Sequence, residues 1–244
     1  MRRRYIRGEA SMFVLHGNVY DTVIHERRTS SLVEFLTDVL LKESRETIAV
    51  YNVATGVRFA KRAKAAGESP ILDELFLSTE KEKVFGGLER MLTQSVKMAV
   101  IIEYAEAIAP AGDSSFQSDA DRAVIVTLHR WSSLPEIERH DNIVLLVTEN
   151  LTELAPKIVA NPKVAVVEVP MPDEAMRKAA ASLADPRLSE ADAARYSEIT
   201  AGLKAVQIAS IPQPPPPAEE KRPSAKRLSP PCSAAQTLPN ARIN

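Results

Sequence analysis

Five short apolar runs, separated by amphipathic segments, dominate the sequence between residues 12 and 184. These runs are Met12–Leu15, Thr47–Val53, Lys97–Ile102, Asn142–Val147 and Val164–Val169. The last four are rich in Val and Ile and almost continuously apolar, which is typical of strands buried on both faces of a parallel sheet. The alternation predicts βαβ crossovers, and therefore a three-layer α/β/α fold with a five-stranded, mainly parallel sheet.

The segments between these runs carry helical periodicity. Helices are expected over Ser31–Glu43, Lys83–Thr93, Asp119–Trp131 and Leu151–Val159. Trp131 ends the third of these and is expected to be a packing anchor, with an exposed interface residue as the alternative. Residues 54–82 show neither the continuous apolar run of a buried strand nor the periodicity of a helix. Their basic residues predict a solvated helix face, or alternatively a contact loop for an acidic partner or a neighbouring subunit. These residues are Arg58, Lys61, Arg62 and Lys64.

Beyond the fifth run, the sequence predicts a smaller helical part and then a tail. Asp173 and Ser189 are expected N-caps for helices over Glu174–Leu183 and from Glu190 to about Ala209. We therefore expect a core over residues 10–184 and a partial helical lid over 185–211. Residues 212–244 are rich in proline and have no apolar periodicity, so they are expected to be disordered.

The composition indicates which kinds of binding partner and which cellular compartment fit this chain. The net charge of −1 and the scarcity of aromatic residues do not indicate nucleic-acid binding. Cys232 is the only cysteine, and the four histidines lack metal-ligand spacing, so neither disulfides nor a thiolate metal site is expected. No apolar run approaches the roughly 20 residues of a membrane-spanning helix. A reducing, cytoplasmic compartment fits these features best.

Polar residues follow several of the predicted strands, where open α/β sheets bind ligands. The loop His16-Gly17-Asn18-Val19-Tyr20-Asp21 stands where a strand followed by a helix would carry a phosphate-binding motif, G-x-x-x-x-G-K-[ST]. That motif needs a lysine after its last glycine, and no Gly-Lys pair occurs in the chain. Candidate binding or catalytic residues at the other strand ends are Glu103, Glu106, Thr148 and Asn150.

The order of these elements resembles the core of the AAA+ ATPases. The stretch KMAVIIEYAE, residues 97–106, is similar to the Walker B strand, and Glu103 falls on its metal-supporting acid. Tyr104 falls on the acid that polarises water. The stretch NIVLLVTEN, residues 142–150, is similar to the sensor 1 strand, where Thr148 and Asn150 stand near the sensor position. Lys163 occupies the region of the arginine finger.

The resemblance implies a degenerate module without a Walker A loop, because the departures fall on the catalytic positions and the apolar framework is kept. Such a module would be non-catalytic and would assemble with, or regulate, an active AAA+ domain or subunit. The chain resembles the N-terminal half of a two-domain AAA+ protein that ends early. Two explanations are open: a truncated or frame-shifted fragment, or an adaptor that works alone.

Two enzymatic alternatives also follow from these residues. In the first, backbone amides of residues 16–21 bind ATP weakly, and Glu103 or Glu106 holds Mg²⁺. In the second, the same acids serve a metal-dependent hydrolase, with His16 as general base. The cofactor therefore stays open at this point, since no phosphate loop supports ATP.

Overall fold

The computed structural model describes residues 10–63, 80–113, 115 and 117–211. Most of the basic segment beyond residue 63, including Lys64, and the predicted tail over 212–244 lie outside the described residues. None of the described helices is long and apolar enough to cross a membrane.

The centre of the fold is a six-stranded sheet with the order β5-β4-β6-β7-β1-β8. Its strands are β1 (Met12–Gly17), β4 (Thr47–Asn52), β5 (Gly56–Lys61), β6 (Met98–Ile102), β7 (Ile143–Val147) and β8 (Val164–Val169). All five predicted apolar runs form strands, and these five are mutually parallel. The α/β prediction is confirmed, with one strand more than expected.

The additional strand, β5, corrects the helical interpretation of the basic segment. β5 runs antiparallel to β4 at one edge of the sheet. Its side chains alternate, with Val57 buried, Arg58 exposed and Phe59 half-buried, which is the two-residue period of a strand rather than of a helix. Gly56, with φ of +74°, allows the tight return from β4.

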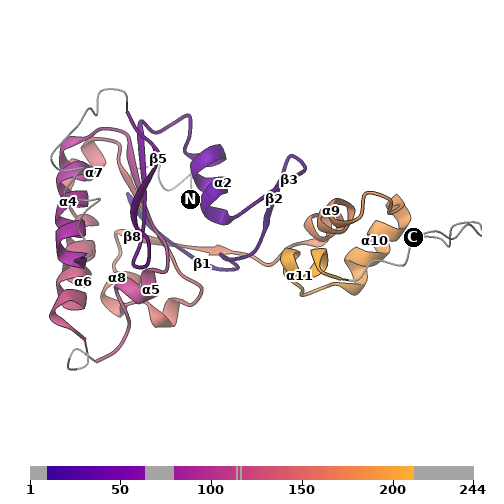
Figure 1. Cartoon of the computed structure of the whole chain (residues 1–244). Helices are drawn as coiled ribbons and strands as arrows, with labels where there is room; N and C mark the ends of the chain where they lie inside the picture. The colour runs from indigo at the N-terminus through magenta and orange to yellow at the C-terminus, as the bar shows by residue number, and fades with distance from the viewer. Residues whose placement is uncertain (1–9, 64–79, 114, 116, 212–244) are drawn as a thin grey trace, which may run out of the picture. The chain divides into compact units, whose positions relative to one another are not determined.

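Helices cover both faces of the sheet unequally (Figure 1). One face carries α4 (Lys81–Gln94), α6 (Asp119–Trp131), α7 (Pro135–Arg139) and α8 (Pro156–Val159). The other carries α2 (Leu32–Phe35), which continues as the π-helical turn η1 (Leu36–Leu40). Successive side chains of a strand point to opposite faces of the sheet. Met12 and Val14 therefore pack in the core beneath α4 and α6, and Phe13 and Leu15 pack in the core beneath α2.

Proline interrupts the helix that was predicted over Leu151–Val159. The structure has instead a 3₁₀ turn, η2 (Leu151–Glu153), followed by the short α8. Ala155 is extended, with ψ of 124°, because the ring of Pro156 disfavours helical backbone in the preceding residue.

Three helices, rather than the two expected, follow β8: α9 (Glu174–Ala184), α10 (Glu190–Ile199) and α11 (Ala205–Ala209). The predicted caps are confirmed, since Asp173 accepts from the N–H of Met176 and Ser189 from that of Asp192. The single helix predicted over Glu190–Ala209 is wrong: a turn at Gly202, with φ of +84°, divides it into α10 and α11.

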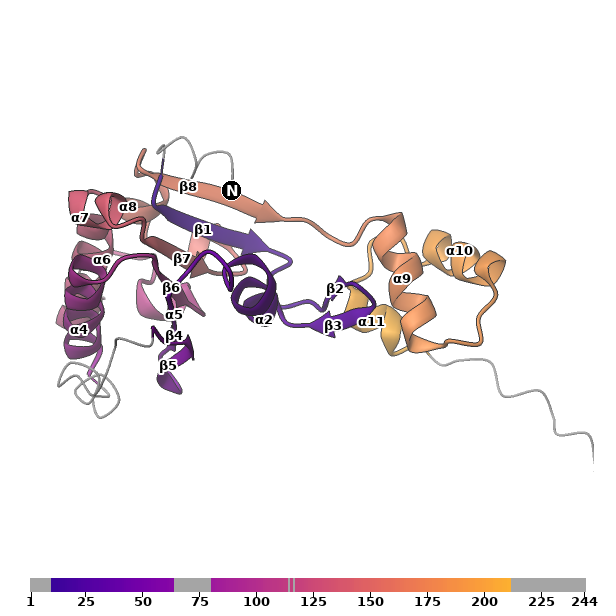
Figure 2. The ribbon, with the colours of Figure 1, turned by 90° about the horizontal axis from the view of Figure 1, so that it is seen from above.

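A β-hairpin that the periodicity did not reveal lies beside these helices in both views (Figures 1 and 2). It consists of β2 (Val23–His25) and β3 (Arg28–Ser30). Ile24 packs against a small apolar cluster formed by Ala180 and Ala181 of α9 and by Ala205 and Ile208 of α11. This cluster, built from α9, α11 and the hairpin, is a third apolar cluster beside the two that line the faces of the sheet.

Candidate functional site

The carboxyl edge of the parallel strands gathers most of the predicted site residues. Here lie the end of β1 with its loop, residues 17–21, and the end of β4 with its turn, residues 52–55. The short α5 (Ala105–Ile108) follows β6, and the segment 148–150 follows β7. Lys163 is different, because it precedes β8 and β8 runs parallel to β1. It therefore lies at the opposite edge of the sheet from the other candidates.

Backbone amides in the loop after β1 donate to the protein's own carbonyl groups. The N–H of Gly17 donates to the carbonyl of Glu149 at 3.0 Å, that of Asn18 to Val169 at 2.9 Å and that of Val19 to Gly17 at 2.8 Å. A phosphate-binding loop needs such amides directed at the ligand. In this conformation these three amides donate to protein carbonyl groups and do not point at a ligand site.

Asp21 ends this loop and is almost fully buried, at 5 % exposure. Its carboxylate accepts from the side-chain amide of Asn18 at 2.8 Å and from the N–H of Thr22 at 2.8 Å. It also accepts from the N–H groups of Ala205 at 2.8 Å and Val206 at 3.0 Å, in the first turn of α11. Burial opposes ionisation of Asp21, but these hydrogen bonds together hold the pKa of the carboxyl below its usual value.

This arrangement predicts an acid-sensitive contribution to stability. We expect Asp21→Asn to lower the free energy of unfolding by about 2 kcal/mol at neutral pH, through loss of charge-assisted hydrogen bonds. Because the folded pKa lies below the unfolded value, the contribution is complete above about pH 4 and is lost as the pH falls through the folded pKa. Urea unfolding of both proteins should therefore give a constant difference from pH 8 to 5 that shrinks below pH 4. A difference that persists unchanged to pH 3 would contradict the assignment.

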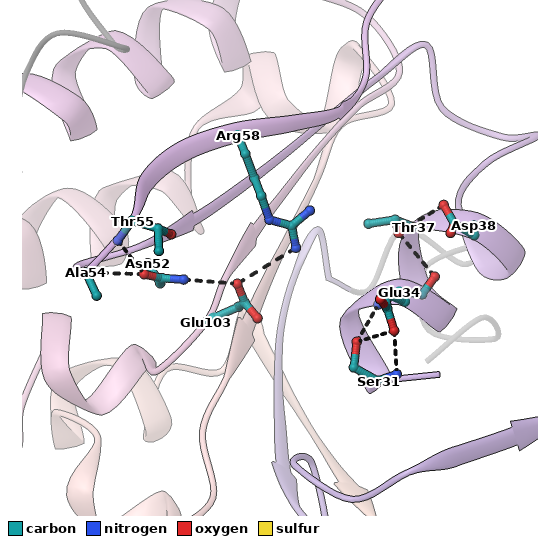
Figure 3. A network of polar contacts seen from close by, with 9 residues as sticks. All are labelled: Ser31, Glu34, Thr37, Asp38, Asn52, Ala54, Thr55, Arg58 and Glu103. Atoms are coloured by element: carbon teal, nitrogen blue, oxygen red, sulfur yellow. Dashed lines mark hydrogen bonds and ion pairs between the residues drawn. The ribbon is translucent and has the colours of Figure 1, made fainter. Parts of the chain in front are cut away.

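Glu103, at the end of β6, is held by two side chains that come from β4 and β5 (Figure 3). The side-chain amide of Asn52 donates to its carboxylate at 3.3 Å, and the guanidinium of Arg58 lies 4.0 Å from the same oxygen. The other end of the Asn52 amide accepts from the N–H groups of Ala54 and Thr55, which fixes its orientation. The carboxylate that a metal would use is thus partly balanced by a cation.

Tyr20 and Tyr104 stack on each other between the ends of β1 and β6. Their ring centroids are 4.8 Å apart, and their planes differ by 16°. Tyr104 adopts left-handed backbone, with φ of +53°, as it begins α5. Burial, then the nearby carboxylates of Glu106 and Glu103, raise the pKa of Tyr20, so its hydroxyl loses its proton only at a more alkaline pH than that of an ordinary tyrosine. One carboxylate oxygen of Glu106 is buried without a hydrogen-bond partner among the described residues.

The remaining candidates make local contacts. The hydroxyl of Thr148 lies 3.3 Å from the carbonyl of Asn150, and the side chain of Asn150 donates to Glu153 at 3.1 Å. His16 lies within β1, in register with Glu168 of β8. Among the described residues no group of three or more acidic, His or Cys side chains is arranged to hold a metal ion.

Sequence reasoning missed Asn52 and Arg58 as neighbours of Glu103. Asn52 ends β4 in the structure, but the predicted strand extended to Val53 and so placed Asn52 inside the strand. Arg58 was missed because its strand was interpreted as a helix. Glu149 stands at the sensor position of the resemblance, but its contacts were not predicted: its carbonyl accepts from Gly17, and its carboxylate pairs with Lys204 at 3.1 Å.

In the parallel part of the sheet, β1 lies between β7 and β8, and the loops that carry the candidate residues lie at the carboxyl edge. This arrangement defines a Rossmann-like α/β module. The sequence model for the AAA+ chaperone, N-terminal Rossmann-like domain, matches residues 1–170. The chain belongs to this family. No curated protein matches the sequence.

A solved structure shares the fold. It is a chain in the structure of the E. coli MS115-1 HORMA:CdnC:Trip13 complex, with a TM-score of 0.50 and 16 % sequence identity. The alignment covers 81 % of the present chain but only 61 % of that chain. The present chain therefore spans about three fifths of its structural neighbour, and at this identity the likeness establishes the fold.

Proposed function

We propose that this chain is a non-catalytic AAA+ module that assembles with, or regulates, an active AAA+ domain or subunit. The observation that carries the proposal is the hydrogen bonding of the loop after β1. Its amides at Gly17, Asn18 and Val19 donate to protein carbonyls, where a working phosphate loop would direct them at a nucleotide.

The acidic end of β6 supports the same proposal. Glu103 is turned toward Asn52 and Arg58, and the next position, where the resemblance places a catalytic acid, is Tyr104. A tyrosine whose ring stacks on Tyr20 cannot serve as a carboxylate base. Lys163 lies at the far edge of the sheet, so within one chain it cannot reach the phosphate side.

The proposed partner is a protein of the AAA+ class. Family membership supports this choice, because the matched domain is the N-terminal part of AAA+ chaperones. The structural neighbour comes from a complex of HORMA, CdnC and Trip13, which is consistent with a role in protein assembly. The single cysteine fits a reducing, cytoplasmic location.

Calorimetry with millimolar ATP tests the proposal against the enzymatic alternatives. We expect no binding heat, with or without Mg²⁺, for the wild-type protein and for Glu103→Ala. The matched control is Glu82→Ala, which removes an exposed acid from α4 and leaves the candidate site residues unchanged. Mg²⁺-dependent binding that Glu103→Ala abolishes and Glu82→Ala preserves would overturn the non-catalytic proposal. It would then assign Glu103 to a working nucleotide site.

A further inference from the structure

We infer that Asp21 and Glu149 form a built-in latch that fastens α11 of the helical lid to the loops after β1 and β7. The latch is made entirely of the protein's own groups and needs no bound nucleotide. This inference goes beyond the absence of catalysis, since it concerns what fixes the position of the lid.

The first half of the latch is the carboxylate of Asp21. The first amides of a helix have no partner within the helix and must be satisfied by other groups. In α11 two of these amides, from Ala205 and Val206, donate to Asp21 across 184 and 185 residues of sequence. A negative charge at this end of a helix is also favoured by the aligned peptide dipoles. Asp21 therefore caps a helix that belongs to a distant part of the chain.

The second half is the ion pair between Lys204 and Glu149. Lys204 immediately precedes α11, and its ammonium group lies 3.1 Å from the carboxylate of Glu149. The backbone carbonyl of Glu149 also accepts from Gly17. The loops after β1 and β7 are thus joined to each other and, separately, to the start of α11. Both members of the ion pair are partly exposed, and exposed ion pairs contribute little to stability. We therefore expect the ion pair to stabilise the latch less than the hydrogen bonds of Asp21 do.

The remaining amides at the start of α11 are satisfied within the lid. The N–H of Lys204 donates to the side chain of Gln207 at 2.9 Å, and the N–H groups of Gln207 and Ile208 donate to the carbonyl of Lys204. Below the helix, Ala205 and Ile208 are buried against α9 and Ile24 of the hairpin. With every donor of its first turn engaged, α11 has no donor left over for a ligand.

Amide hydrogen exchange on the full chain, resolved by residue, tests the latch. We expect Asp21→Ala to speed exchange at Ala205 and Val206 by about tenfold or more, the usual consequence of losing a charge-assisted hydrogen bond. Asp173→Ala is the matched control, because Asp173 caps α9 and accepts from the N–H of Met176, three residues further along the chain. It should change exchange at Met176 and leave Ala205 and Val206 as they are. Millimolar Mg·ATP should leave both amides of the wild type unchanged.

Two results would overturn the latch. One is exchange at Ala205 and Val206 within twofold of the wild type in Asp21→Ala; the other is stronger protection of these amides in the wild type on adding Mg·ATP. If Asp21→Ala does not fold, Asp21→Asn keeps one acceptor oxygen, and a rise of about threefold or more in the same exchange rates is then expected. Mg²⁺-dependent ATP binding that Glu103→Ala abolishes, without any change in the protection of Ala205 and Val206, would overturn the proposed function and leave the latch standing.

Discussion

Replacing Trp131 with alanine should lower the free energy of unfolding by about 3–5 kcal/mol, the usual cost of truncating a buried aromatic side chain. Trp131 is fully buried and stacks on Phe85, with ring centroids 5.4 Å apart. Its indole N–H also donates to the carboxylate of Glu89 at 2.8 Å. The substitution would therefore leave both a cavity between α4 and α6 and a carboxylate oxygen with one donor fewer.

Guanidinium-induced unfolding, followed by circular dichroism, measures this loss as a fall in the transition midpoint. Val126→Ala is the control on the same helix, because Val126 is 53 % exposed and its truncation should cost no more than about 0.5 kcal/mol. A loss below 1 kcal/mol for Trp131→Ala would contradict its place in the core. The alternative of an exposed interface residue is already excluded by its zero exposure.

Gly17→Ala should be the most damaging single-methyl substitution at the site, with a loss of about 2–3 kcal/mol. Gly17 has φ of +94°, which side chains rarely tolerate. An added Cβ would also lie 2.9 Å from the carbonyl oxygen of Val169, which is the acceptor for the amide of Asn18. Relief of this contact requires the loop to move away from β8, and with it Asp21.

Two other glycines distinguish the effect of backbone strain at positive φ from the effect of the steric contact with Val169. Gly56 also has positive φ, at +74°, but an added Cβ there meets nothing within 4 Å, so Gly56→Ala should cost only about 1 kcal/mol. Gly86 lies within α4 with open space around it, and Gly86→Ala should stabilise the protein by about 0.5–1 kcal/mol. Equal losses at Gly17 and Gly56, measured by urea unfolding, would show that the contact with Val169 is unimportant.

The sequence predicted the sheet because its signals are local. A run of Val and Ile residues between turn residues is recognisable within a window of five or six positions, and each of the five runs became a strand. The caps Asp173 and Ser189 were found for the same reason, since a cap and the amide it accepts from are three residues apart. Local signals failed at β5, whose basic residues hid a two-residue alternation.

The class of fold, the family and the absence of the phosphate-binding lysine can therefore be read from the sequence. What the loop after β1 does instead depends on contacts that form only in the folded protein. Its amides face carbonyls of β8 and of the segment after β7, and Asp21 meets α11 at a separation of 184 residues. No local window contains such partners, because they are brought together only when the parallel strands align their carboxyl ends at one edge. For the same reason Lys163, close to these elements in sequence, lies at the other edge of the sheet.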